Sequence, residues 1–147
     1  MVRSILGVVV GAIVWMAGFY ALAILLAMLW PDYALHGREF FRDGVFTFTP
    51  PMACFNLLFW VLAEIATGWV AMKIAKRREA VWVLAGLLGV YLASLHIVLY
   101  WPRFPWWYNL AVVIPAVPAV LLGARLAGPL RSAGPTVEAG ARPSGGN

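Results

Sequence analysis

The first apolar segment constrains this chain most, because no charged residue occurs between Ser4 and Pro31. As a helix, the apolar run from Ile5 to Trp30 would reach about 39 Å at about 1.5 Å per residue. The hydrocarbon core of a bilayer is only about 30 Å thick. This run is longer than a soluble core helix needs, so the sequence predicts an integral membrane protein.

The composition supports the same conclusion, since 63% of the residues are hydrophobic and only 12% are charged. Soluble domains carry about 25% charged residues. Arg3, Ala21 and Ala23 give the first segment some likeness to a cleaved signal peptide, but its apolar run continues through Leu29. We therefore expect a retained membrane anchor.

Further apolar segments predict an all-α fold, an integral membrane bundle of four transmembrane helices in up-and-down order. The expected spans are residues 5–30, 51–72, 80–100 and 106–124. A polar loop that contains His36 joins the first two spans, and the Pro50-Pro51 pair is typical of a helix start.

The end of the chain differs from the four spans. Pro115 and Pro118 predict a kink in the fourth helix. Residues 128–147 are rich in Gly, Pro, Ala and Ser, which is typical of a disordered tail. We therefore expect one transmembrane domain over residues 1–127, followed by a disordered cytoplasmic tail.

Basic residues are distributed unequally between the two sides of this predicted bundle. One side holds eight of them: Arg3, Lys73, Lys76, Arg77, Arg78, Arg125, Arg131 and Arg142. The other side holds Arg38, Arg42 and Arg103. The positive-inside rule then predicts a multi-pass protein with both termini in the cytoplasm. The net charge of +5 follows from this topology and from attraction to anionic lipid, so no nucleic-acid partner is expected.

Small residues recur at four-residue spacing on every predicted span, where they allow helices to approach closely. They are Gly7 and Gly11, then Ala63, Thr67 and Ala71, then Ala85, Gly89 and Ala93, and finally Ala119, Gly123 and Ala127. The pattern predicts a compact bundle and is equally consistent with a monomer and a homodimer.

Glu64 is the most informative side chain, because it lies nine residues before Lys73 and so about 14 Å from the inner boundary of the membrane. A charged acid at the bilayer centre costs about 2.5 to 3.5 kcal/mol on insertion scales. We expect Glu64 to face the bundle and to be protonated or hydrogen-bonded, with Tyr91 or the indole of Trp15 as donor. A proton-linked role and a structural hydrogen bond are both open.

Asn56 and His96 form a second candidate polar site, because both lie about 25 Å from the inner boundary. Tyr100 and Asn109 can join them in a pocket near the outer surface. The simpler interpretation is one interhelical hydrogen bond, worth about 0.6 kcal/mol on average. His96 lies about 11 Å from the depth of Glu64, so we expect no direct contact between the two.

Aromatic residues are expected at the membrane interfaces, where amphipathic rings suit the headgroup region. The predicted outer belt comprises Trp101, Trp106, Trp107 and Tyr108. Trp15 and Trp60 lie inside the predicted bundle, where they serve as packing mass or as stacking surfaces for a flat ligand.

Cysteine and histidine are scarce: Cys54 is the only cysteine, and His36 and His96 are the only histidines. These counts exclude an intrachain disulfide, a thiolate metal cluster and a pair of haems each held by two histidines. Signatures of hydrolases, zinc proteases and nucleotide sites are absent. We expect Cys54 to fill apolar space, and we expect no metal, no cofactor and no enzymatic activity.

Two motifs carry a resemblance to a known group. Phe104-Pro-Trp-Trp-Tyr-Asn109 precedes a proline-bearing span that ends in Leu122-Gly-Ala-Arg-Leu126, and a second motif is Gly68-Trp-Val-Ala-Met-Lys-Ile-Ala-Lys-Arg-Arg-Glu79. Over roughly residues 1–127 the pattern resembles uncharacterised proteobacterial inner-membrane proteins with four spans. Asn109 stands where the group's aromatic motif has a histidine. The resemblance implies a fold and a location, and it implies no activity.

Two classes of function are consistent with these features. The favoured one is a structural or accessory membrane protein whose bundle binds lipid, a partner in a membrane complex or a second copy of itself. The alternative is a small proton-coupled transporter that uses Glu64, similar in outline to the small multidrug-resistance transporters. Those transporters carry their acid on the first span, where this chain has none.

Overall fold

The computed structural model describes residues 1–128 of the chain, and every regular element among them is helical. The elements are α1 (Val2–Leu29), α2 (Pro31–Asp43), α3 (Pro50–Ala75), α4 (Arg78–Leu95), the π-helical segment η1 (His96–Tyr100) and α5 (Trp106–Leu126). The predicted all-α class is therefore confirmed. The tail predicted for 128–147 lies, apart from Gly128, outside the described residues.

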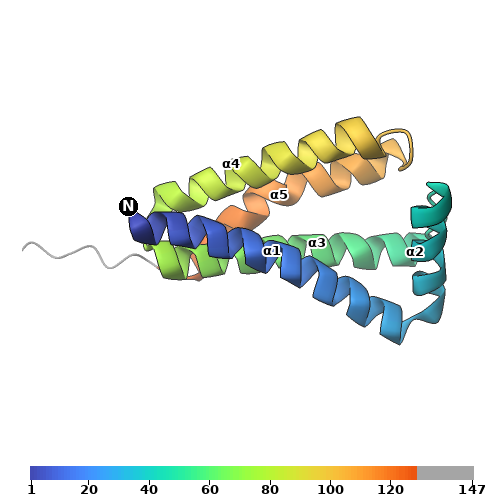
Figure 1. The fold of residues 1–147 in the computed structure, drawn as a ribbon, viewed down its shortest axis with the longest axis horizontal. Coiled ribbons are helices and arrows are strands. Elements are labelled where there is room, and N and C mark those ends of the chain that lie inside the picture. Colours follow the sequence, from blue (N-terminus) through green and yellow to red (C-terminus); the bar gives the residue numbers. More distant parts are fainter. Residues whose placement is uncertain (129–147) are drawn as a thin grey trace, which may run out of the picture.

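Four of these helices are long and apolar enough to cross a membrane: α1, α3, α4 with η1, and α5. They alternate in direction, so the start of α1 and the end of α5 lie at one end of the bundle, with α2 at the opposite end (Figure 1). We call these the terminal end and the α2 end. The predicted up-and-down order is confirmed, while the side of the membrane that each end faces stays a prediction.

The segment predicted as a polar loop is in fact mostly α2, which lies across the end of the bundle (Figure 1). Pro31 begins the helix and Gly44 ends it in the left-handed conformation, with φ of 70°. Tyr33 and Phe40 are seven residues apart and are both buried, which is the spacing of one helical face. The prediction was wrong because the polar residues of the other face hid this two-turn pattern. His36 therefore lies on a helix.

Small residues set the distances between the long helices, and α3 packs against α1, α4 and α5. A methyl group on Gly68 would overlap the backbone carbonyl of Val120, and one on Gly123 would overlap that of Ile65. The backbones of α3 and α5 are therefore in direct contact at this crossing. On α1, a methyl group on Gly7 would lie 2.7 Å from the Cβ of Ala75. Part of the predicted small-residue pattern is thus used for contacts inside one chain.

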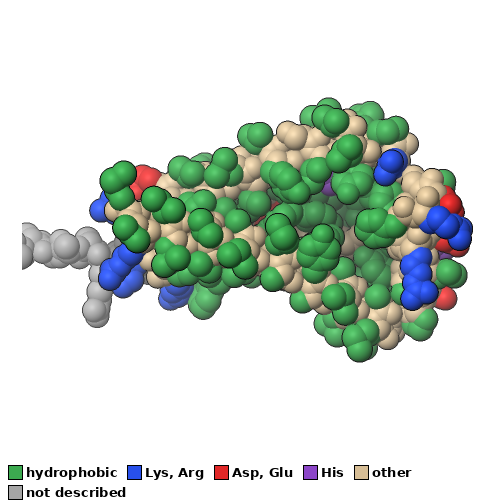
Figure 2. All heavy atoms as spheres, in the orientation of Figure 1, with side chains coloured by type: hydrophobic (Ala, Val, Ile, Leu, Met, Phe, Trp, Pro, Cys, Tyr) green, Lys and Arg blue, Asp and Glu red, His purple; other side chains and the backbone are tan. Residues whose placement is uncertain are grey.

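Charged side chains gather at the two ends of the molecule, and the surface between them is largely apolar (Figure 2). This division suits a bilayer, because charges stay in water while the apolar middle faces lipid. Helix α5 runs through Pro115 and Pro118 without interruption. Cys54 is exposed on the side of α3, so it does not fill space inside the bundle as expected.

Candidate functional site

Glu64 lies near the middle of the 26-residue helix α3 and has no exposed surface. Neither of its carboxyl oxygens has a hydrogen-bond partner among residues 1–128. A buried carboxyl group without a partner is costly, especially when it is charged. The structure thus contains the mid-bundle acid that the sequence suggested, but it lacks the hydrogen bond that would make this acid an ordinary structural contact.

The indole of Trp15 lies at the same level of the bundle. Gly18 lies about one turn after Trp15 on α1. A methyl group added to Gly18 would lie 3.8 Å from the Cβ of Ala63, the residue before Glu64 on α3. The ring of Trp15 also lies 5.6 Å from the ring of Trp60, between centroids, and Trp60 is one turn before Glu64 on the same face. The Trp15 Nε1 group is buried and has no partner in the described chain either.

The predicted donors to Glu64 are wrong. The ring of Tyr91 packs edge-on against Trp15 with 5.8 Å between centroids, and 49% of Tyr91 is exposed. Neither this phenol nor the Trp15 indole donates a hydrogen bond to Glu64. The sequence placed all three at similar depth but could not fix the rotation of each helix. Tyr91 therefore lies at the α1–α4 edge of the site.

His96 and Asn109 form a polar pair nearer the α2 end. The imidazole Nδ1 and the Asn109 Oδ1 are 2.7 Å apart, and the Asn109 Nδ2 donates to the carbonyls of Phe104 at 3.2 Å and Pro105 at 3.4 Å. Because the amide nitrogen is used by two carbonyls, its oxygen is the acceptor and the His96 Nδ1 carries the proton. The lone pair of His96 then resides on Nε2.

His96 is buried, with 3% of the residue exposed, and it begins the π-helical segment η1. Such segments often occur at functional sites. A shallow pocket of about 380 Å³ opens beside it between η1 and α5, and its lining is His96, Ile97, Trp101, Asn109, Leu110 and Val113. This pocket is nearly all apolar apart from the histidine and the asparagine.

The four residues of the predicted outer pocket do not form one cluster. Asn56 donates to the Tyr108 hydroxyl at 3.0 Å and not to His96. The ring of Tyr100 lies 5.3 Å from the ring of His96. The structure therefore brings His96, Asn109 and Tyr100 together, and it pairs Asn56 with a residue that the sequence assigned to the interface belt.

Tyr108 is 2% exposed and stacks on Phe104 with 4.9 Å between ring centroids. Its assignment to the outer belt was wrong, because the start of α5 turns this side chain towards Asn56 and the bundle. Trp101, Trp106 and Trp107 are exposed at 49%, 66% and 42%. Their place in the headgroup region stays a prediction.

Trp60 lies between the two polar sites. Its ring centroid is 5.6 Å from that of Trp15 and 6.4 Å from that of His96, and 4.2 Å from that of Phe19. From the sequence, Trp60 was predicted either to fill space inside the bundle or to stack on a flat ligand. In the structure it is the aromatic element that separates the unpartnered Glu64 from the hydrogen-bonded His96.

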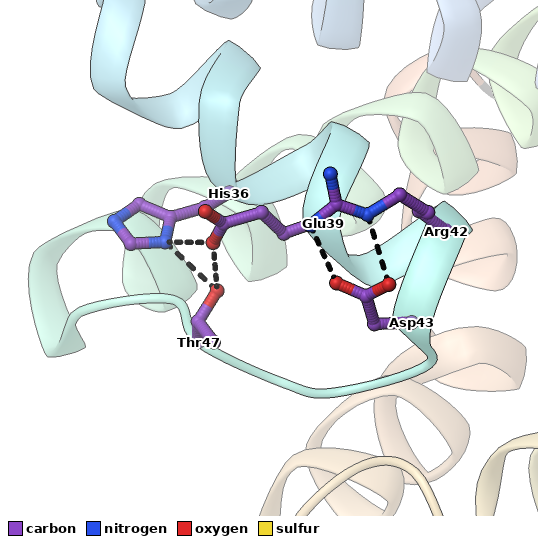
Figure 3. A network of polar contacts seen from close by, with 5 residues as sticks. All are labelled: His36, Glu39, Arg42, Asp43 and Thr47. Carbon is purple, nitrogen blue, oxygen red and sulfur yellow. Dashed lines mark hydrogen bonds and ion pairs between the residues drawn. The ribbon is translucent and has the colours of Figure 1, made fainter.

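A third polar group lies on the outer surface of α2 (Figure 3). The Thr47 hydroxyl donates to Glu39 Oε2 at 3.3 Å and accepts from His36 Nδ1 at 2.8 Å. Arg42 forms two hydrogen bonds with Asp43, and they hold the pKa of the Asp43 carboxyl below its ordinary value. The two Thr47 contacts fasten the irregular segment between α2 and α3 to the helix. In residues 1–128 no three His, Cys, Asp or Glu side chains gather to hold a metal ion.

Comparison with protein-family models, with curated proteins and with solved structures finds no match to this chain. The resemblance to four-span proteobacterial proteins therefore stays a prediction, and the site is interpreted from its own geometry.

Proposed function

We propose that this membrane protein is a small proton-coupled transporter of lipophilic cations, and that Glu64 exchanges a proton for the cation. The observation that carries the proposal is the enclosed Glu64 carboxyl without a hydrogen-bond partner in the described chain. Ionisable groups inside a membrane are rare and costly, and they mark proton and substrate pathways.

A structural role for Glu64 is less well supported. A structural clamp needs a donor on a neighbouring helix, and the two candidates, Tyr91 and Trp15, do not donate to it. Without a donor, the acid costs free energy and stabilises nothing. A proton held in the membrane interior explains why such a group is tolerated, because the neutral acid is far less costly to bury than the anion.

The surroundings of Glu64 favour a cation as the exchanged ligand. Trp60 lies one turn before Glu64 on α3, and the rings of Trp15 and Tyr91 continue this aromatic cluster, with 5.6 Å between the centroids of Trp60 and Trp15 and 5.8 Å between those of Trp15 and Tyr91. Aromatic faces attract cations, more strongly where water is excluded. When the proton leaves Glu64 for water, the carboxylate formed can balance the positive charge of the ligand, and the free Trp15 indole N–H is available to stabilise it.

Because Glu64 has no exposed surface, a rigid helix from another protein cannot reach it, and a cation reaches it only when the surrounding side chains move. The small residues of α1 and the α3–α5 crossing are also occupied within one chain. The accessory role favoured by the sequence would therefore have to use other surfaces. A dimer, which small exporters of this kind need, would have the same requirement.

The excess of Lys and Arg at the terminal end supports the proposal that both termini face the cytoplasm. We propose the bacterial inner membrane as the location, on the resemblance to four-span proteobacterial proteins. In this orientation α2 faces the outer side, and the lipid bilayer surrounds the four long helices.

Binding of tetraphenylphosphonium to the purified full chain tests the transporter proposal. Glu64→Gln is expected to abolish binding, because the amide keeps the shape and cannot become an anion. Glu79→Gln is the matched control, since Glu79 is exposed in the first turn of α4, and it should bind as the original chain does. If Glu64→Gln binds the cation unchanged, the proposal is wrong. Absence of binding together with co-purification of another membrane complex would favour the accessory role.

A further inference from the structure

A second pocket, far from Glu64, lies at the terminal end between α3, α4 and α5. Its volume is about 400 Å³, and its lining is Met72, Arg78, Val81, Trp82, Leu121, Ala124, Arg125 and Gly128. Two arginines that are 47 positions apart in the sequence thus meet at one opening. Arg78 is the first residue of α4 and Arg125 lies in the last turn of α5.

Neither guanidinium group has a carboxylate partner among residues 1–128. The ion pairs found in residues 1–128 both lie on α2, at the opposite end of the bundle. Glu79 is the acidic residue nearest to the pocket in sequence, and it makes no ion pair with any described residue. At the terminal end the described chain holds six basic side chains and this one carboxylate: Arg3, Lys73, Lys76, Arg77, Arg78 and Arg125, with Glu79. The opening is therefore strongly positive.

The interior of the pocket has the opposite character. Met72, Val81 and Ala124 are buried and apolar, with 7%, 1% and 4% exposed, and they form its inner wall. Trp82 is 59% exposed and stands beside Arg78 on the next turn of α4. An aromatic residue with one apolar side and one polar group is typical of the headgroup depth of a membrane.

We propose that this pocket binds the phosphate of an anionic membrane phospholipid between Arg78 and Arg125, with the glycerol and upper acyl carbons against the apolar wall. Arginine suits a phosphate because its planar fork donates two parallel hydrogen bonds. Basic pockets between helices on the cytoplasmic side bind lipid headgroups in this way. The α4 N-terminus adds partial positive charge at the same opening. The inference does not depend on the role of Glu64.

The apolar wall decides between a lipid and a free anion. Inorganic phosphate would be held by the two arginines alone and would leave the exposed Trp82 and the half-buried Leu121 of the lining uncovered. A phospholipid already lies at this depth in the membrane and covers the wall as its phosphate meets the arginines. The pocket is therefore assigned to a lipid headgroup rather than to a soluble anion.

Native mass spectrometry of the full chain in detergent tests this assignment. The probes are phosphatidylglycerol and phosphatidylcholine with identical acyl chains, so only the headgroup differs. Arg78→Gln with Arg125→Gln removes both pocket cations. Arg3→Gln with Arg77→Gln is the matched control, because it removes the same net charge at the same end from two exposed arginines that do not line the pocket.

The pocket variant is expected to lose phosphatidylglycerol affinity by about tenfold or more relative to the control variant, since one charge-assisted hydrogen bond corresponds to roughly tenfold in affinity. Leu121→Trp, which fills the pocket without a change of charge, should lower lipid binding as well. Equal losses in the two double variants would overturn the proposal, because binding would then follow net charge alone. Equal retention of the two lipids, or full displacement by inorganic phosphate, would also contradict it.

Discussion

Towards the terminal end the helices meet through small residues, whereas towards the α2 end they meet through aromatic rings and hydrogen-bonded side chains. At the terminal end, Gly68 and Gly123 bring the backbones of α3 and α5 into contact. Near the α2 end, α1 diverges from α4 (Figure 1), and His96, Asn109 and Tyr108 join the remaining helices.

The two kinds of packing differ in how they can move. Backbones in direct contact cannot adjust without separating, because nothing between them can rotate. Aromatic side chains can change rotamer and leave the helices in place. Glu64 lies where the two regions meet, so a ligand is expected to reach it from the α2 half. The terminal half is then expected to stay rigid while the ligand binds.

The largest expected effect is at the α3–α5 crossing. Gly68→Ala should lower the free energy of unfolding by about 3 kcal/mol, because the new methyl group overlaps the Val120 carbonyl and forces the backbones apart. Gly86→Ala is the control: nothing lies within 4 Å of its added methyl group, so a gain of up to about 1 kcal/mol from helix propensity is expected. Reversible unfolding in mixed micelles measures both, and equal stabilities would show that the terminal half is not rigidly packed.

A smaller loss is expected at the end of α2. Gly44 has φ of 70°, a conformation that costs other residues about 1 to 2 kcal/mol. Gly44→Ala should therefore loosen α2 and speed hydrogen exchange over Pro31–Asp43, with little change in α3. Gly37→Ala, which has open space around it, should not. Unchanged exchange in Gly44→Ala would mean that the α2 cap does not depend on this turn.

In the terminal half, a substitution at the end of α3 is expected to stabilise the protein. Lys76 ends α3 with φ of 54°, where glycine avoids the strain of a side chain. Lys76→Gly should raise the free energy of unfolding by about 1 kcal/mol. The same unfolding assay checks it, with Lys73→Gly inside α3 as a control that should lose about 1 kcal/mol. A loss in both variants would contradict the left-handed end of α3.

The smallest expected effect is the coupling between His96 and Asn109. A double-mutant cycle with His96→Ala and Asn109→Ala should give about 0.6 kcal/mol, the average for interhelical hydrogen bonds in a membrane protein. Unfolding of the original chain, the two single variants and the double variant supplies the four free energies needed. A coupling of zero would mean that these side chains do not interact in the folded protein, and the α2 half would lose its best-defined polar contact.

The four long helices could be predicted from the sequence because apolar length alone defines a span. The predictions that failed depend on the rotation of each helix about its axis and on short sequence patterns. Tyr91 and Tyr108 were placed on the wrong faces of their helices, since position along a helix follows from residue counting but facing requires the contacts between helices. Helix α2 was missed because its buried face consists of only two aromatic residues in a polar segment.

The candidate site was partly predictable for the same reason. Glu64 can be identified from the sequence alone, because it is the single acidic residue in a long apolar run. The absence of a donor to it could not be predicted, because this depends on where Trp15 and Tyr91 point. The pairing of Arg78 with Arg125 joins residues from two helices, and its only sequence signal was that both stand at the same end of neighbouring spans.

The most direct test of the central claim is the infrared carbonyl band of a protonated carboxylic acid in the full chain at neutral pH, taken as the difference between the original protein and Glu64→Gln. We predict that this band is present without ligand and disappears when tetraphenylphosphonium saturates the site, with release of one proton per bound cation. A difference spectrum without the band, or a band that saturating cation leaves unchanged, would contradict an exchangeable proton on Glu64.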